Sequence, residues 1–160
     1  MTDMLVNLLR LPSLEPALDH AKQSGVIVRR AQPFELTPVR VFVERNFSSG
    51  WADEVSVGFT NKPVTVMVAT FEKHLIGFAA YECTRKTFFG PMGVVDATRS
   101  KGIGKALLLT CLQGLQEMGY VYGIIGGVGP VEFYADAVAA VIIPESDPGI
   151  YTDLLRGPKQ

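Results

Sequence analysis

Residues 94–109 read VVDATRSKGIGKALLL and join a short apolar run to a long helix with an apolar stripe. Gly102 and Gly104 lack a Cβ atom, so the backbone can turn tightly and present bare N–H groups to a ligand. The new helix points its unpaired N–H groups and the positive end of its dipole at the same place. Three cationic side chains stand beside them: Arg99, Lys101 and Lys105. The stretch therefore predicts a site for an anion.

Two common phosphate-binding motifs do not fit this stretch. A P-loop needs Gly where Arg99 stands and Ser or Thr where Ala106 stands. A dinucleotide fingerprint needs a third Gly where Leu107 stands. The spacing therefore argues against ATP held by a P-loop and against NAD.

The pattern Arg99-x-x-Gly102-x-Gly104 resembles the loop that binds the coenzyme A pyrophosphate in the GCN5-related N-acetyltransferase family, or GNAT. The family's pattern is Arg or Gln, two residues, Gly, one residue, and Gly or Ala, and this chain matches every fixed position. The resemblance covers about residues 26–143. It implies acetyl-CoA as cosubstrate and an α/β, GNAT-like acyl-CoA N-acyltransferase fold, with a mixed, mostly antiparallel sheet, splayed central strands and flanking helices.

Composition narrows the class of protein further. The chain has 160 residues, a length that suits one domain. Its net charge of −1 and its pI near 6.1 predict no general attraction to nucleic acid. Cys83 and Cys111 lie far apart with no histidine near them, so we expect no metal site and no disulfide framework. The N-terminus has no basic region before an apolar run, and no apolar run approaches membrane-spanning length. We therefore expect a cytoplasmic protein without a membrane partner.

Hydrophobic periodicity predicts the order of elements. The first 25 residues are expected to form a helical extension packed on an acetyltransferase domain of residues 26–160, with helices at Met1–Leu11 and Glu15–Gln23. The sequence does not distinguish between a loop and a broken helix for residues 47–59. The expected strands are Val26–Arg30, a hairpin of Val64–Thr70 with Leu75–Cys83, then Thr87–Val95, Tyr120–Ile125 and Val138–Ile143. The expected helices are Phe34–Asn46, Gly102–Met118 and Val131–Ala137.

The predicted strand Thr87–Val95 contains Gly90, Pro91 and Gly93, so it needs a bulge or a break. The resemblance implies that this strand is bulged and splays from the next one, opening a slot for the pantetheine arm. It also implies that N–H groups freed at a bulge over residues 93–95 stabilise the acetyl oxyanion. The expected cofactor-binding residues are Gly93, Val94, Val95, Arg99, Ser100, Lys101, Gly102, Ile103, Gly104, Lys105 and Phe133.

The aromatic pair Phe133-Tyr134 lies on the short helix after the predicted central strand. The resemblance implies that the Tyr134 hydroxyl lies near the thioester sulfur and donates a proton to the departing thiolate. The alternative is a tyrosine that packs on the core with its hydroxyl at the surface.

The sequence does not identify the general base. The candidates are the carboxylates nearest the expected cleft, which are Glu82, Glu54 and Asp96. We retain Tyr134, Glu82 and Glu54 as catalytic candidates, although each carboxylate also suits a structural role. Trp51 with Glu54 suits an acceptor pocket that offers an aromatic wall and a carboxylate to a cation.

Three functions follow from these residues. The leading one is transfer of an acetyl group from acetyl-CoA to a primary amine of a small molecule or an amino-acid derivative. The alternatives are a CoA-binding sensor or interaction domain without efficient catalysis, and a nucleotide-binding module. The identity of the acceptor, the acyl-chain preference and the choice between monomer and homodimer stay open.

Overall fold

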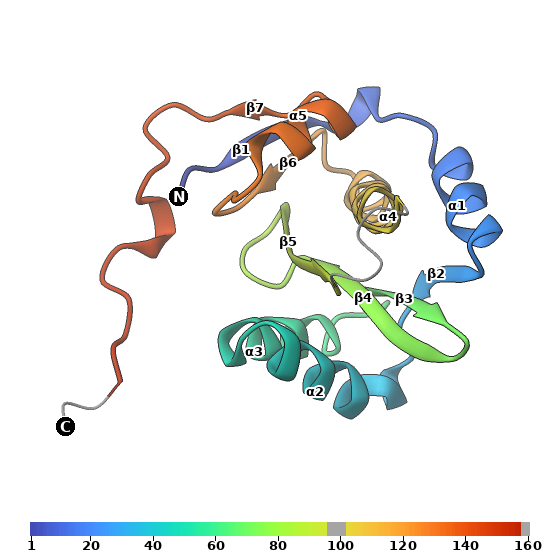
Figure 1. The fold of residues 1–160 in the computed structure, drawn as a ribbon. Coiled ribbons are helices and arrows are strands. Elements are labelled where there is room, and N and C mark those ends of the chain that lie inside the picture. The colour runs from blue at the N-terminus through green and yellow to red at the C-terminus, as the bar shows by residue number, and fades with distance from the viewer. Residues whose placement is uncertain (96–101, 158–160) are drawn as a thin grey trace.

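A computed structural model describes residues 1–95 and 102–157 and shows one seven-stranded sheet with helices on both faces (Figure 1). The strand order is β2-β3-β4-β5-β6-β1-β7. The strands are β1 (Met4–Asn7), β2 (Val26–Arg30), β3 (Val66–Phe71), β4 (His74–Tyr81), β5 (Phe88–Val94), β6 (Tyr122–Ile125) and β7 (Val141–Ile142). The helices are α1 (Leu14–Gln23), α2 (Leu36–Asn46), α3 (Ser49–Gly58), α4 (Ile103–Glu117) and α5 (Val131–Val138).

Two buried clusters hold these layers together. The larger cluster lies between α4 and the sheet, where Leu107, Leu108 and Leu112 are completely buried, and α1 packs beside α4. The smaller cluster lies between the other face of the sheet and α2 with α3, around Val43 and Phe78. Within the described residues, no helix combines the length and the apolar character needed to cross a membrane.

Most of the predicted elements are confirmed to within a few residues. The β3–β4 hairpin turns through Glu72 and Lys73, which both have positive φ angles, of 47° and 67°. Helix α4 ends before Gly119, whose φ of 96° suits a glycine just past a helix end. The open region of residues 47–59 is mostly helical, because Ser48 caps α3 by accepting a hydrogen bond from the Trp51 N–H at 3.1 Å.

The helix predicted for Met1–Leu11 is wrong, because Met4–Asn7 forms strand β1. Met4 and Val6 are buried while Leu5 and Asn7 are only partly buried, which is the two-residue period of a strand. Strand β1 lies between β6 and β7, with Met4 opposite both Ile125 and Ile142. Its partners come from the far end of the chain, so tertiary pairing overrides the local helical pattern.

Strand β5 carries the predicted irregularity at Gly90 and Pro91. Phe89 pairs with Tyr81 and Met92 pairs with Ala79, so β5 has one residue more than β4 between these two pairs. Strands β5 and β6 run parallel and pair only at Phe88–Ile124 and Phe89–Ile125. Beyond this point β5 continues along β4, whereas β6 ends at Ile125. The central strands are therefore splayed, as expected.

Replacement of Gly114 by Ala should destabilise the protein. A Cβ atom at Gly114 would lie 2.5 Å from Cζ of Tyr81, which is buried and accepts a hydrogen bond from Arg30 at 2.9 Å. Overpacking costs about 1–3 kcal/mol, whereas exchanging a helical Gly for Ala returns about 0.5–1 kcal/mol. We expect a net loss of about 1 kcal/mol in the free energy of unfolding, measured by urea denaturation. Gly50→Ala is the control because its Cβ would meet open space, and equal stability of both variants would contradict this packing account.

Candidate active site

A cavity of about 730 Å³ lies where β5 and β6 separate. Its walls come from β5, the start of α4, the glycine-rich loop after β6, the start of α5, helix α3 and a segment near the C-terminus. The lining includes the side chains of Trp51, Glu54, Phe133, Tyr134 and Tyr151, together with the backbone of Gly104. The described residues contain no cluster of side chains suited to a metal ion.

The start of α4 forms one end of this cavity. Gly102 precedes the helix with a φ of 69°, a conformation that favours glycine, and Gly104 lines the cavity. A Cβ atom at Gly104 would lie 3.6 Å from Cζ of Phe133, so the missing side chain keeps the gap between α4 and Phe133 open. The first turn contains no acidic residue, and its N–H groups lack helical acceptors. Such a helix start is suited to an anion.

Other predicted cofactor-binding residues have mixed outcomes. Arg99, Ser100, Lys101 and the candidate Asp96 lie outside the described residues. Ile103 is fully buried and Lys105 is exposed at the start of α4. His20, which sequence reasoning did not select, packs on Gly102 from α1, because a Cβ there would lie 2.9 Å from the His20 ring.

The prediction of a bulge over residues 93–95 is wrong in its position, because the extra residue falls at Gly90 and Pro91. Gly93 and Val94 do line the cavity. The N–H of Val95 donates to the carbonyl of Ile76 at 3.0 Å, so the sheet uses this group and it is not an oxyanion donor. A role of the Gly93 and Val94 backbone toward the acetyl group stays a prediction.

Tyr134 lies on α5 and lines the cavity with 8% of its surface exposed. Its ring makes edge contacts with Phe133, at 5.0 Å between centroids, and with Phe89, at 6.2 Å. Burial raises the pKa of Tyr134 to about 12. Its hydroxyl therefore keeps its proton at neutral pH and is able to donate it.

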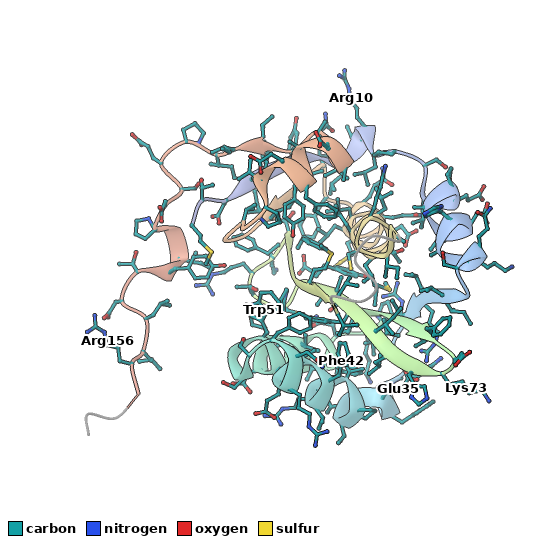
Figure 2. All side chains as sticks on the ribbon, viewed as in Figure 1. Arg10, Glu35, Phe42, Trp51, Lys73 and Arg156 are labelled. Carbon is teal, nitrogen blue, oxygen red and sulfur yellow. The ribbon has the colours of Figure 1, made fainter. Side chains whose placement is uncertain are left out.

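Glu54 and Trp51 form the opposite side of the cavity, one turn apart on α3. The Trp51 ring stacks on Phe47 with centroids 5.5 Å apart, and Figure 2 shows it between α3 and the sheet. Phe47 in turn packs on Gly93, where a Cβ atom would overlap its ring. The Glu54 carboxylate accepts a hydrogen bond from Thr84 Oγ1 at 2.5 Å. The predicted pairing of Trp51 with Glu54 in one pocket agrees with this geometry.

Glu82 does not line this cavity. It lies after β4 with a φ of 57°, and its carboxylate accepts a hydrogen bond from the Thr87 N–H at 2.7 Å. This bond closes the turn that leads into β5. The structure therefore separates the two candidate bases, and of these two only Glu54 lines the same cavity as Tyr134.

Sequence reasoning missed Tyr151, which lines the cavity from the 3₁₀ turn Gly149–Tyr151. Its ring and hydroxyl lie 3.0 Å from the position of a Cβ at Gly127. No local pattern in residues 144–157 distinguishes this tyrosine from an ordinary surface aromatic.

Known proteins resemble this chain in structure but not detectably in sequence. No family model and no curated protein matches the sequence. A GCN5-related glucosamine N-acetyltransferase region of a fungal multi-domain beta-N-acetylglucosaminidase has a TM-score of 0.71 and 15% identity, over 89% of this chain and 19% of that one. A GCN5-related N-acetyltransferase from Sphaerobacter thermophilus has a TM-score of 0.68 and 18% identity, over 89% and 48%.

A third similar structure is an aminoglycoside acetyltransferase from an uncultured soil metagenomic sample, in complex with trehalose. Its TM-score is 0.52 at 18% identity, over 71% of this chain and 88% of that one. This chain spans about a fifth and about half of the length of the first two structures. The splayed central strands, the helix start at Gly104 and these likenesses together show that the chain has the fold of the GCN5-related N-acetyltransferases.

Proposed function

We propose that this protein is an N-acetyltransferase that moves an acetyl group from acetyl-CoA to a primary amine of a small molecule or an amino-acid derivative. One observation carries the proposal: a single cavity is lined by a glycine at the start of α4, a buried tyrosine and a carboxylate, contributed by Gly104, Tyr134 and Glu54. The acetyltransferases among the similar structures support acetyl transfer as the type of reaction.

The start of α4 is the proposed site for the pyrophosphate of acetyl-CoA. Gly104 leaves room between the helix and Phe133, and the N–H groups of the first turn would donate to phosphate oxygens. The pantetheine arm would then follow the opening between β5 and the loop Gly126–Pro130, which both line the cavity. This path leads the thioester toward Tyr134.

The proposed reaction is a direct attack. The amine nitrogen forms a bond to the acetyl carbonyl carbon, and the carbon–sulfur bond then breaks with both electrons passing to sulfur. Tyr134 donates its proton to the thiolate, and Glu54 accepts the proton that leaves the amine, directly or through water. The products are the acetylated amine and coenzyme A. Glu54 releases its proton to bulk solvent, which also returns a proton to Tyr134. An amine that binds as an ammonium ion loses one further proton to solvent before it attacks.

Release of free thiol from acetyl-CoA, followed with a thiol reagent across a panel of primary amines, tests this function. Amine-dependent thiol release with a matching acetylated product is the expected result. Tight binding of acetyl-CoA without turnover of any amine would instead indicate a sensor domain. Displacement of acetyl-CoA by ATP would indicate a nucleotide-binding module.

A pair of matched substitutions tests which of the two candidate carboxylates acts as the base. Glu54→Gln should lower kcat/KM for a responsive amine by about 10²-fold, because the carboxylate at the cavity is lost. Glu82→Gln should leave kcat/KM within about twofold, because Gln still accepts a hydrogen bond from Thr87 and Glu82 lies outside the cavity. The measurement is initial-rate kinetics at saturating acetyl-CoA. A larger loss for Glu82→Gln than for Glu54→Gln would reverse the assignment.

A further inference from the structure

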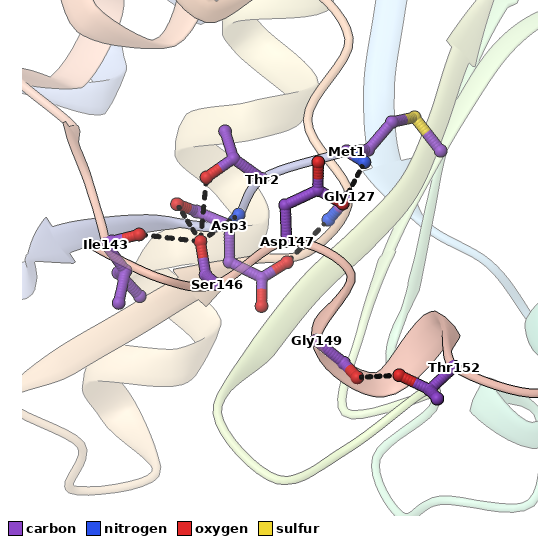
Figure 3. A network of polar contacts seen from close by, with 9 residues as sticks. All are labelled: Met1, Thr2, Asp3, Gly127, Ile143, Ser146, Asp147, Gly149 and Thr152. Atoms are coloured by element: carbon purple, nitrogen blue, oxygen red, sulfur yellow. Dashed lines mark hydrogen bonds and ion pairs between the residues drawn. The ribbon is translucent and has the colours of Figure 1, made fainter.

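The segment after β7 is tied to the start of the chain by the Ser146 hydroxyl and by an ion pair between the α-ammonium group of Met1 and Asp147 at 2.8 Å (Figure 3). Ser146 Oγ lies 2.7 Å from Thr2 Oγ1, accepts from the N–H of Asp3 at 2.9 Å and donates to the carbonyl of Ile143 at 2.7 Å. The N–H of Ile143 also donates to the carbonyl of Asp3 at 2.9 Å. These bonds hold the C-terminal segment beside β1.

Asp3 extends this connection to the cavity wall. The side chain is buried, with 8% of its surface exposed, and its Oδ1 accepts from the N–H of Gly127 at 2.8 Å. Its Oδ2 lies 3.5 Å from the position of a Cβ at Gly149. One carboxylate therefore contacts both the glycine-rich loop of the cavity and the turn that carries Tyr151.

Tyr151 packs directly on that glycine-rich loop. A Cβ at Gly126 would lie 3.3 Å from the Tyr151 hydroxyl, and one at Gly127 would lie 3.0 Å from the ring. Burial raises the pKa of Tyr151, and the carboxylates of Glu54 and Asp3 raise it further. The side chain thus adds a neutral aromatic wall and a hydroxyl donor on the Glu54 side of the cavity.

Few charged groups line this cavity among the described residues. Glu54 is the one charged side chain among the described residues that line it, and the remaining lining is mostly aromatic, aliphatic or glycine. Met1 also lines the cavity, and its α-ammonium group is already paired with Asp147 at 2.8 Å. A substrate carboxylate in this pocket would meet Glu54 and no cationic side chain from the described lining. A second ammonium group would find no second carboxylate among the lining residues that the structure describes. Burial of either unpaired charge is costly.

We infer that the acceptor is a primary amine with a single positive charge on an apolar, aromatic body, with its ammonium group beside Glu54 and its body against Trp51 and Tyr151. This inference rests on the proposed acetyltransferase function and specifies its substrate class. Tyr151 is then a specificity-determining residue that the C-terminal segment brings to the pocket. The aromatic walls suit both the apolar body and a nearby cation.

Comparison of amines that differ in the number and sign of their charged groups tests the substrate class. The probes are phenethylamine, phenylalanine, phenylalanine methyl ester and spermidine, each measured by thiol release under the same conditions. We expect kcat/KM for phenethylamine and for the ester to exceed the values for phenylalanine and spermidine at least 10-fold. In Glu54→Gln the ratio of ester to phenylalanine should narrow, even though both rates fall.

A matched pair of tyrosine variants tests the pocket wall. Tyr151→Ala should raise KM for phenethylamine about 10-fold, because it removes acceptor contacts. Acetyl-CoA affinity should fall less than this, because Tyr151 contacts Gly126 and Gly127 on the proposed pantetheine path but not the start of α4. Tyr122→Ala is the control, since Tyr122 is 52% exposed and does not line the cavity. Melting temperatures of both variants verify that they fold, and a Tyr151→Ala protein too unstable to assay is replaced by Tyr151→Leu, for which the same rise in KM is expected.

The two levels of the proposal fail differently. If no amine supports thiol release, the acetyltransferase function itself is wrong. If phenylalanine or spermidine is acetylated as efficiently as phenethylamine, only the acceptor class is overturned. An unchanged KM for phenethylamine in Tyr151→Ala would show that Tyr151 does not contact the acceptor.

Discussion

Gly104→Val should weaken acetyl-CoA binding by about 10²–10⁴-fold while the protein stays folded. The added methyl groups would fill the gap toward Phe133, which lies 3.6 Å from the position of a Cβ. They would also shield N–H groups of the first turn from phosphate oxygens, and two lost charge-assisted hydrogen bonds account for about 3–6 kcal/mol. Isothermal titration calorimetry with acetyl-CoA measures the loss.

Helix α3 offers a closely matched control for this variant. Gly50 is the second residue of α3, as Gly104 is the second residue of α4, and a side chain at Gly50 would meet open space. Gly50→Val should therefore bind acetyl-CoA normally. Neither variant should lose much stability, because Val has a higher helix propensity than Gly. Unchanged affinity in a folded Gly104→Val protein would refute the anion site at the start of α4.

Tyr134→Phe should lower kcat by about 10–10³-fold and leave acetyl-CoA affinity nearly unchanged. The substitution keeps the ring contacts with Phe133 and Phe89 and removes only the proton donor. An interaction made only in the transition state affects kcat rather than ground-state binding. The loss stays moderate because a thiol with a pKa of about 8.5 is already a fair leaving group. Steady-state kinetics with the best amine of the panel provides the measurement.

The pH profile gives an independent check on Tyr134. Because burial raises its pKa to about 12, the hydroxyl stays protonated through the range in which the amine loses its own proton. Activity of the unmodified protein should therefore rise with pH to a plateau and show no decline from Tyr134 below about pH 10. A wild-type kcat in Tyr134→Phe, with chemistry rate-limiting, would return this residue to a purely packing role.

Local chemistry in the sequence determined the glycine-rich start of α4 and much of the fold. Gly102 and Gly104 predict a tight approach to a helix start, and the structure confirms the helix and the positive φ of Gly102. Gly90 and Pro91 predict an interrupted strand, because proline cannot donate to a sheet, and the extra residue of β5 lies there. These signals act within a few residues, so they are readable without the tertiary structure.

Contacts between distant segments decided the rest. Met4–Asn7 is a strand only because β6 and β7 lie on either side of it. Glu54 and Glu82 are equivalent carboxylates in the sequence, and only the fold directs one to the cavity and the other to the Thr87 N–H. Tyr151 reaches the pocket because Ser146 and Asp3 connect the two ends of the described chain. Burial and hydrogen bonding between remote residues follow from the folded path of the chain, so no local pattern reveals them.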